Sequence, residues 1–436
     1  MQSFLKKSVA TLLRLEARLV LRKYKPHIVA ITGSVGKTST KDAIYAVVAA
    51  GAYTRKSEKS FNSEIGLPLT VLGQPNAWHN PLRWVENFFG GLSLWLWRKR
   101  YPEWLVLEVG ADRPGDIRSL ASWLSVDVAV ITRLPEVPVH VEFFDSAAQL
   151  KEEKASLIRA LKSDGALVLY ADDPEVVALR HRAPAARVVT FGFSDAADVR
   201  AHDVQIIFAN QGERSWPAGM QAQITMGGKT GALQVQGAIG AHALLPALAA
   251  AGVGYALGRD WDQILEALKG YEPPHGRMHL VYGEKDTLII DDTYNSSPAA
   301  VEAAFEALAL LPKAPRTRKI AVMGDMLELG RQSVEEHRKV GAHAAKIVDM
   351  LITVGFRARD IAQGALDNGL ADGKIFQFES AERVGKELEG MLKAGDTILI
   401  KGSQSIRMEK IVEELMMYPE QAVNELVRQD AEWKKR

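Results

Sequence analysis

The sequence predicts an α/β protein in which a phosphate-loop domain precedes a Rossmann-like α/β domain. Short β-branched runs alternate with helical stretches over most of the chain, which is typical of mostly parallel sheets covered by helices. Residues 204–239 instead alternate with a period of two, which predicts a small antiparallel patch in the first domain. A single core rarely exceeds about 250–300 residues. The 436 residues of this chain therefore predict at least two domains.

The composition excludes several functional classes. The chain has 54 basic and 53 acidic residues, and its net charge of +1 gives no general attraction to nucleic acid. It has no cysteine, so disulfides and thiolate nucleophiles are excluded. The sequence shows no signal-peptide or membrane-spanning pattern, and the nearly uncharged run 240–258 is better explained by a buried helix. We expect a cytoplasmic, monomeric protein without a nucleic-acid partner.

Residues 1–26 predict a basic amphipathic helix that precedes the first domain. Glu16 is the single acidic residue among them. The basic residues are Lys6, Lys7, Arg14, Arg18, Arg22, Lys23 and Lys25. The apolar residues that could form one stripe are Leu5, Val9, Leu12, Leu13, Leu19 and Val20.

Residues 27–273 form the predicted central domain and residues 274–436 the predicted C-terminal domain. In the central domain we expect strands at 28–32, 104–109 and 126–132, and helices at 37–50 and 146–161. Proline and glycine in the segment 271–276 indicate a linker. Beyond it, strands are expected at 288–290, 319–323, 350–354 and 397–400.

The segment 32–39, Thr-Gly-Ser-Val-Gly-Lys-Thr-Ser, follows a predicted strand and opens a predicted helix. Gly33 and Gly36 allow a tight turn whose amide groups face a phosphate, and the helix N-terminus adds a positive field. Lys37 would contact the β- and γ-phosphates, and the Thr38 hydroxyl would bind Mg²⁺. The alternative is an ordinary glycine turn before a helix. The order of strand, glycine loop and helix favours the phosphate loop.

Three further side chains could complete a metal site. Glu108 ends an apolar strand, where a Mg²⁺ ligand beside a phosphate loop is expected. His140 and Lys154 follow within the same domain. Taken singly, each has an ordinary explanation: a strand-end acid that caps the next element, a structural imidazole, and a lysine on a solvated helix face.

In combination these residues resemble the Mur ligase family over roughly residues 27–415. Beside the phosphate loop, the matching segments are 61–68 (FNSEIGLP), 107–116 (LEVGADRPGD), 276–278 (GRM), 291–298 (DDTYNSSP), 322–330 (VMGDMLELG) and 401–403 (KGS). His140, Glu142 and Lys154 also match the family's histidine and carbamylated lysine in order and spacing. The segments 292–298 and 323–330 are specific to the branch that adds D-alanyl-D-alanine.

The resemblance implies roles for individual residues. Thr38 and Glu108 would hold one Mg²⁺, and His140 with a carbamate on Lys154 would help to hold a second. An ammonium beside Mg²⁺ would be repelled, whereas its CO₂ adduct is an anionic ligand. The residues implied to act in catalysis are Lys37, His140 and Lys154. Those implied to contact ATP are Gly33, Ser34, Val35, Gly36, Lys37, Thr38, Ser39, Asn62, His242, Arg277, Asp292 and Asn295.

The implied reaction is ATP-dependent formation of an amide bond. A carboxylate would attack the γ-phosphorus in line, and the resulting acyl phosphate would react with an amine. The implied substrates are a UDP-muramoyl tripeptide and D-alanyl-D-alanine, in the synthesis of peptidoglycan precursors. The alternatives are a related ligase acting on another acceptor such as poly-γ-glutamate, a nucleotide-binding partner protein without catalysis, and a small-molecule kinase.

The chain departs from the family pattern in three places. Only 32 residues precede Gly33, too few for the N-terminal domain that grips UDP, so other surfaces are expected to do so. The segment 240–247 has Ala243 and Pro246 where the family has asparagine, so adenine contacts are expected to differ. An aromatic insert occupies about residues 78–104. Its aromatic residues include Trp78, Trp84, Phe88, Phe89, Trp95, Trp97 and Trp104, and Arg98-Lys-Arg100 lies near its end.

Two explanations fit the N-terminal helix and the aromatic insert. They could pack together or lie at a membrane surface, because aromatic residues flanked by arginine and lysine suit a lipid interface. Alternatively, both segments pack on the central domain and replace surface lost with the missing domain.

Overall fold

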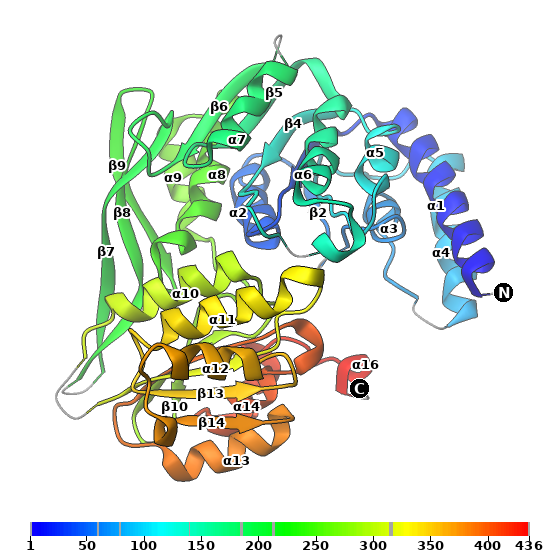
Figure 1. The fold of residues 1–436 in the computed structure, drawn as a ribbon. Coiled ribbons are helices and arrows are strands. Elements are labelled where there is room, and N and C mark those ends of the chain that lie inside the picture. The colour runs from blue at the N-terminus through cyan, green and yellow to red at the C-terminus, as the bar shows by residue number, and fades with distance from the viewer. Residues whose placement is uncertain are drawn as a thin grey trace.

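The computed structural model describes residues 2–58, 61–77, 80–138, 140–183, 186–211, 214–313 and 317–434, and of residues 2–7, 211, 214 and 431 only the backbone. The chain forms two sheets, each between layers of helices, with the second sheet below the first in Figure 1. The first sheet ends at Gln236 and the second begins at His279, on either side of the predicted domain boundary. The α/β expectation is confirmed.

The first sheet has nine strands in the order β2-β3-β1-β4-β5-β6-β7-β8-β9. The parallel strands are β1 (His27–Thr32), β2 (Thr54–Lys56), β3 (Trp104–Glu108), β4 (Val126–Ile131), β5 (Leu161–Tyr170) and β6 (Arg187–Gly192). The antiparallel patch consists of β7 (Val199–Gln211), β8 (Arg214–Met226) and β9 (Lys229–Gln236). The period-two prediction for 204–239 is therefore confirmed.

Helices cover both faces of this sheet because each buried strand turns alternate side chains to opposite sides. On one face lie α2 (Lys37–Ala49), α8 (Leu245–Ala256) and α9 (Trp261–Lys269). The other face is covered by α1 (Gln2–Tyr24), α3 (Gly66–Leu72), α5 (Asp116–Ala121), α6 (Ala147–Ala155) and α7 (Pro174–Ala178). The short 3₁₀ turns are η1 (Val141–Phe143), η2 (Ser156–Ala160), η3 (Leu179–Arg182) and η4 (Ala241–Ala243).

One predicted helix is shorter than expected. The sequence suggested a single helix over 146–161, but α6 ends at Ala155 and continues as the 3₁₀ turn η2. The turn ends at Ala160 because Leu161 already pairs with Val126 as the first residue of β5. Sheet pairing therefore overrides local helix propensity at this position.

The second sheet has six strands in the order β10-β11-β15-β12-β13-β14. They are β10 (His279–Gly283), β11 (Thr287–Asp292), β12 (Lys319–Gly324), β13 (Met350–Val354), β14 (Ile375–Phe378) and β15 (Thr397–Lys401), all parallel except β10. One face packs on α10 (Pro298–Leu310), α11 (Ser333–Ala344) and α12 (Arg359–Asp367), the other on α13 (Ala381–Met391) and α14 (Glu409–Leu415). The short C-terminal elements are η5 (Gly330–Gln332), η6 (Asp372–Lys374), η7 (Gln404–Ile406), η8 (Pro419–Gln421), α15 (Ala422–Glu425) and α16 (Ala431–Lys434).

The two sheets are connected through the segment before β10. Leu280 N donates to Gly237 O at 2.9 Å and Ile239 N donates to Met278 O at 3.2 Å, so this segment pairs with the end of the first domain. Trp216 on β8 contacts Tyr282 on β10 edge-on, with 5.4 Å between ring centroids. The antiparallel strands therefore reach from the first domain to the second, as Figure 1 shows.

The N-terminal helix and the aromatic insert lie side by side at one edge of the molecule (Figure 1). The insert forms α4 (Pro81–Leu96), which begins after the capping side chain of Asn80. Lys23 Nζ on α1 donates to the carbonyls of Leu94, Trp95 and Trp97 at 2.9, 2.8 and 2.8 Å. One ammonium group thus satisfies the carbonyls at the end of α4.

The inner face of α4 also reaches the core of the first domain, where Trp84 and Leu94 pack against buried residues. The expectation that the two segments pack together is confirmed, and so is their packing on the central domain. Trp78, which belongs to the expected insert, lies outside the described residues, as do the side chains of Lys6 and Lys7. In the described parts of the chain, every helix is too short or too polar to cross a membrane.

Glu16 is buried where α1 meets α4. It is 5% exposed, and among the described residues its carboxylate oxygens have no hydrogen-bond partner. A Cβ added to Gly91 of α4 would lie 2.5 Å from Glu16 Oε2, so a larger residue there would require the Glu16 carboxylate to move. Burial raises the pKa of Glu16 to about 7.

We predict that Glu16→Gln stabilises the protein more at pH 8 than at pH 5.5. The unfolded chain releases this proton near pH 4.5, whereas the folded chain retains it to about pH 7. The destabilisation by Glu16 therefore grows between these values and is complete above pH 7. The gain at pH 8 should be about 2 kcal/mol, measured by urea unfolding. Glu86→Gln on the exposed face of α4 is the control, and an equal gain at both pH values would contradict the prediction.

Candidate active site

The phosphate loop joins β1 to α2 in the predicted conformation. Gly33 has φ 145° and Gly36 has φ 82°, both in the region that favours glycine. A Cβ on Gly33 would lie 1.9 Å from Thr132 Oγ1 at the end of β4. The Thr132 hydroxyl donates to Val35 O at 2.8 Å, and Ser34 N donates to Arg133 O at 3.0 Å. The neighbouring strand end thus shapes the loop through one side-chain and one backbone hydrogen bond.

The first turn of α2 continues the loop toward the centre of the site. Among the described residues no side chain caps this turn, so its amide groups and positive end remain oriented toward the loop. Thr38 and Ser39 are buried there, at 8% and 7% exposure.

Two lysine side chains meet at one carbonyl of this loop. Lys37 Nζ donates to Gly33 O at 3.0 Å, and Lys154 Nζ on α6 donates to the same oxygen at 2.9 Å. The Lys154 residue is 2% exposed. Burial lowers the pKa of Lys154 well below its ordinary value, and the neighbouring Lys37 lowers it further. Burial also lowers the pKa of Lys37, with Glu108 acting in the opposite direction. Burial and the charge of Lys37 thus both favour the neutral amine of Lys154 over its ammonium form.

Glu108 lies at the end of β3 directly beside α2. Thr38 Oγ1 donates to Glu108 Oε2 at 3.0 Å, and Asn62 Nδ2 donates to Glu108 Oε1 at 3.1 Å. The carboxylate is buried, at 1% exposure. A hydroxyl and a carboxylate this close provide the hard oxygen ligands that Mg²⁺ requires. Thr38 and Glu108 therefore fit a magnesium site beside the loop.

His140 connects the first domain to the second. It has φ 72°, a conformation uncommon outside glycine. Its Nδ1 lies 2.5 Å from Glu328 Oε2, and its Nε2 lies 4.0 Å from Asp112 Oδ1. The hydrogen bond with His140 lowers the pKa of Glu328. Asp112 also raises the pKa values of Lys37 and Lys154, which indicates that His140 and both lysines share one electrostatic environment.

The second domain contributes a separate group around Lys401. Lys401 Nζ is buried and donates to Asp292 Oδ2 at 2.6 Å and to Asn295 O at 2.9 Å. Burial lowers the pKa of His242 to about 4, a shift that Asp292 opposes and Lys401 reinforces. The imidazole of His242 is therefore neutral at physiological pH and lies within the field of this pair.

Arg277 acts electrostatically on both this group and the phosphate loop. Its guanidinium is stacked 4.1 Å from the ring centroid of Tyr294. Its charge lowers the pKa values of both Lys37 and Lys401. Arg277 is thus close enough to influence the charge of both lysines.

The structure brings the residues selected from the sequence into two groups. The first group surrounds the phosphate loop and contains Asn62, Glu108 and Lys154; the second contains His242, Asp292 and Asn295. His140 approaches the first group through Asp112. Sequence reasoning did not select Asp112, Glu328 or Lys401 as site residues. All three lie in segments matched to the family, and their charges at strand ends or in adjoining loops were the available signal.

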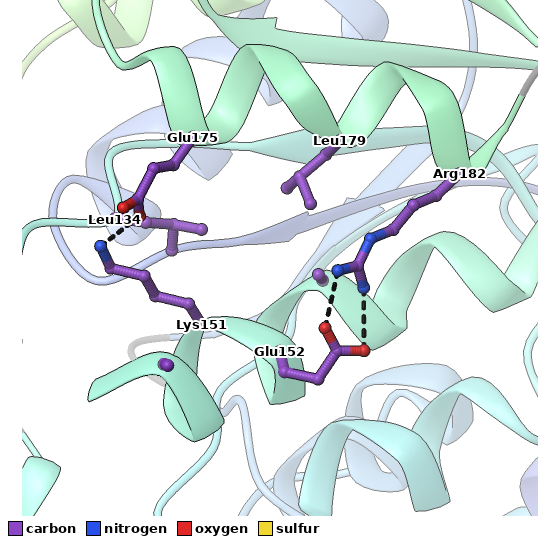
Figure 2. A pocket seen from close by; sticks show the side chains of 8 residues that line it. Leu134, Lys151, Glu152, Glu175, Leu179 and Arg182 are labelled. Carbon is purple, nitrogen blue, oxygen red and sulfur yellow. Dashed lines mark hydrogen bonds and ion pairs between the residues drawn. The ribbon is translucent and has the colours of Figure 1, made fainter. Parts of the chain in front are cut away.

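A depression of about 280 Å³ lies on a different face of α6 (Figure 2). Lys151 pairs with Glu175, and Arg182 pairs with Glu152 through contacts of 2.7 and 2.8 Å. These charges neutralise each other, and none of the selected site residues lines the depression. It is therefore separate from the candidate active site.

Comparisons with known proteins show which family both domains resemble. Residues 92–254 match the Mur ligase middle domain, and residues 276–404 match the Mur ligase, glutamate ligase domain. UDP-N-acetylmuramoyl-tripeptide–D-alanyl-D-alanine ligase of Bacillus subtilis is 29% identical over 94% of this chain and 80% of that protein. The enzyme of the same name from Mycobacterium bovis is 30% identical over 89% of this chain and 72% of that protein.

A solved structure of the same family has a similar fold. The MurF ligase of Thermotoga maritima, determined in complex with ADP, superposes with a TM-score of 0.74 at 28% identity, covering 93% of this chain and 83% of that one. The chain belongs to the Mur ligase family. Mur ligases are ATP-dependent enzymes, and the family and fold expected from the sequence are confirmed.

We predict that Gly33→Ala strongly weakens nucleotide binding. The added methyl group would overlap Thr132 Oγ1, and alanine disfavours the required φ, so the loop must change shape. ADP affinity, measured by calorimetry, should fall at least about 100-fold. Gly258→Ala is the control, because Gly258 also has positive φ but has no atom within 4 Å of an added Cβ. Wild-type affinity in Gly33→Ala would contradict the assigned loop.

Proposed function

We propose that this chain is the ATP-dependent ligase that joins D-alanyl-D-alanine to a UDP-muramoyl tripeptide through an acyl phosphate. The observation that carries the proposal is the buried Lys154 amine, 2.9 Å from the Gly33 carbonyl of the phosphate loop. An ordinary nucleotide-binding loop has no need for a second buried lysine at this position. The similarity to enzymes of that name over most of the chain supports the same assignment.

The first proposed metal position uses Thr38 and Glu108. Their oxygens lie 3.0 Å apart, and Asn62 orients the carboxylate from its other side. When bound there between the phosphates of ATP, Mg²⁺ would neutralise charge that develops during phosphoryl transfer. Lys37 would contact the phosphates from the same loop, together with the amides of Gly33, Ser34, Val35, Gly36, Thr38 and Ser39.

The second proposed metal position uses His140 and a carbamate on Lys154. Carbon dioxide adds to a neutral amine with release of one proton, and the lowered pKa of Lys154 favours the amine form that this step needs. The product is anionic, and the adjacent Lys37 ammonium would stabilise it. Burial of the lysine end would limit the access of water to the modified group. The same change turns a cation that repels Mg²⁺ into an oxygen ligand.

The second domain is proposed to complete the nucleotide site. Arg277 would contact phosphates, because its charge already acts on Lys37. Asp292 and Asn295, held by Lys401, would face the nucleotide together with the neutral His242. The backbone around Ala243 and Pro246 would meet adenine without the usual asparagine side chains. Contact between His140 and Glu328 across the domains would exclude water from the acyl phosphate.

Phosphate release with a substrate panel tests the proposed reaction. We expect release when ATP, Mg²⁺, UDP-muramoyl tripeptide and D-alanyl-D-alanine are all present, with a product whose mass equals the joined peptides. Lys154→Ala should lower the rate at least about 100-fold, because an electrostatic element of phosphoryl transfer is lost. Lys151→Ala is the control, since Lys151 lies on the same helix but pairs with Glu175.

Other outcomes of the same panel would replace the proposal. Release with a different acceptor, such as a γ-linked glutamate peptide, would identify another Mur-type ligase. A stable phosphorylated product formed without an amine would identify a kinase. No turnover with any substrate would favour a nucleotide-binding partner protein.

We also propose that the outer face of α4 contacts an anionic membrane surface. Leu82, Phe89 and Trp97 are exposed by 73%, 61% and 62%. Arg98, Lys99 and Arg100 follow directly and are also exposed. Exposed aromatic residues next to cations match the boundary between acyl chains and acidic headgroups. The packing of α4 on α1 leaves this face outward.

Vesicle flotation tests the membrane contact. The wild-type protein should float with vesicles containing phosphatidylglycerol and remain below vesicles of pure phosphatidylcholine, because both cationic and apolar contacts contribute. Phe89→Ser combined with Trp97→Ser should reduce flotation at least about fivefold. Phe356→Ser, which changes an exposed aromatic residue of the other domain, should have no effect. A wild-type protein that stays below the anionic vesicles would exclude this contact.

A further inference from the structure

A cluster of two histidines and one glutamate lies at the segment that joins the two domains. His275 and His279 flank Arg277 on this segment, and Glu425 is the last residue of α15 near the C-terminus. One possible ligand atom from each of the three side chains lies within 4.8 Å of the other two. None of these residues belongs to the proposed nucleotide or magnesium positions.

The backbone conformation explains how the cluster forms. Gly276 has φ 68° and Met278 has φ 56°, so the chain turns sharply between the two histidines. Their rings therefore meet edge-on, with centroids 5.0 Å apart. The intervening Arg277 stacks on Tyr294 instead, which separates it from the imidazoles.

The C-terminal segment delivers Glu425 to the same place. Glu425 Oε2 lies 2.9 Å from His279 Nε2. The adjoining Arg428 donates to the carbonyls of Thr293 and Tyr294 at 2.5 and 3.1 Å, which holds this segment over the second domain. A Cβ on Gly276 would lie 2.9 Å from Val427 Cγ1, so the segment also packs on the turn itself. Glu425 is thus placed by its neighbours as well as by its ion pair.

We propose that His275, His279 and Glu425 bind a divalent transition-metal ion such as Zn²⁺. Two imidazoles and one carboxylate are a ligand set that Zn²⁺ prefers and that Mg²⁺ does not. Ligand atoms of a tetrahedral zinc ion lie roughly 3.3 Å apart, close to the distance already present between His279 and Glu425. The side chains of His279 and Glu425 are 14% and 38% exposed, which leaves a path for the ion and a position for water.

The bound ion would fasten the joining segment to the C-terminal segment. The two histidines lie at the start of the second domain and Glu425 lies near its end, so the ion would close a loop of about 150 residues. Arg277 lies between the two histidine ligands, so a bound ion would restrict its movement away from Tyr294. This site extends beyond the proposed ligase function and does not depend on it.

Binding of Zn²⁺ and Co²⁺ to the metal-free full chain tests the site. Calorimetry with ZnCl₂ should show that the protein binds one equivalent of Zn²⁺ and that Mg²⁺ does not displace it. Protein titrated with CoCl₂ should show the visible absorption of tetrahedral Co²⁺. His275→Ala and Glu425→Gln should weaken this binding at least about tenfold. His279→Gln, which keeps a polar side chain on β10, provides a second ligand variant if the alanine change alters folding.

Two control variants distinguish this site from others. His202→Ala removes a surface histidine that pairs with Asp203, and binding should be unchanged. His140→Ala removes the imidazole of the candidate active site, and the protein should still bind one equivalent of Zn²⁺. Retention of full binding in both His275→Ala and His279→Gln, or its loss in His140→Ala, would overturn the proposal.

Discussion

The arrangement of the candidate active site depends on the carbonyl oxygen of Gly33. Two amine groups from different parts of the chain, Lys37 and Lys154, donate to this single oxygen. Two ammonium groups bound to one oxygen would repel each other. The electrostatic free-energy cost of this repulsion is lower when one of the amines is neutral. The glycine turn, the strand end that carries Thr132 and the buried end of α6 are all needed to produce this contact. The pKa shift of Lys154 therefore follows from the fold around the loop.

The parts of the fold with strong local signals could be predicted from the sequence. The alternation of β-branched strands with helices, the glycine loop and the period-two stretch all correspond to observed elements. Local signals failed where distant pairing decides the outcome. The helix expected to continue to residue 161 ends early because Leu161 pairs with Val126. The strand β14, with only four residues, has too little pattern to be recognised before its neighbour β13 is known.

The same distinction applies to the site. Lys37, Thr38 and Glu108 could be selected because a loop and a strand end specify their positions. Asp112, Glu328 and Lys401 were not selected, since their importance arises from contacts between segments far apart in the chain. Glu328 and His140, for example, are separated by most of the first domain and are joined at 2.5 Å only after both domains pack. A sequence pattern can place such residues near a motif, but the contact itself depends on tertiary structure.

The contact of Lys23 with the end of α4 has a consequence for how that helix is encoded. Many helices end with a glycine, often with a proline shortly after it, and the residues Leu94–Trp97 contain neither. Here the terminal carbonyls are satisfied by a lysine about seventy positions earlier in the chain. The residue that stabilises the C-terminal end of α4 thus belongs to α1. The two segments therefore depend on each other structurally, and the aromatic helix can end in tryptophan because α1 supplies donors to its last carbonyls.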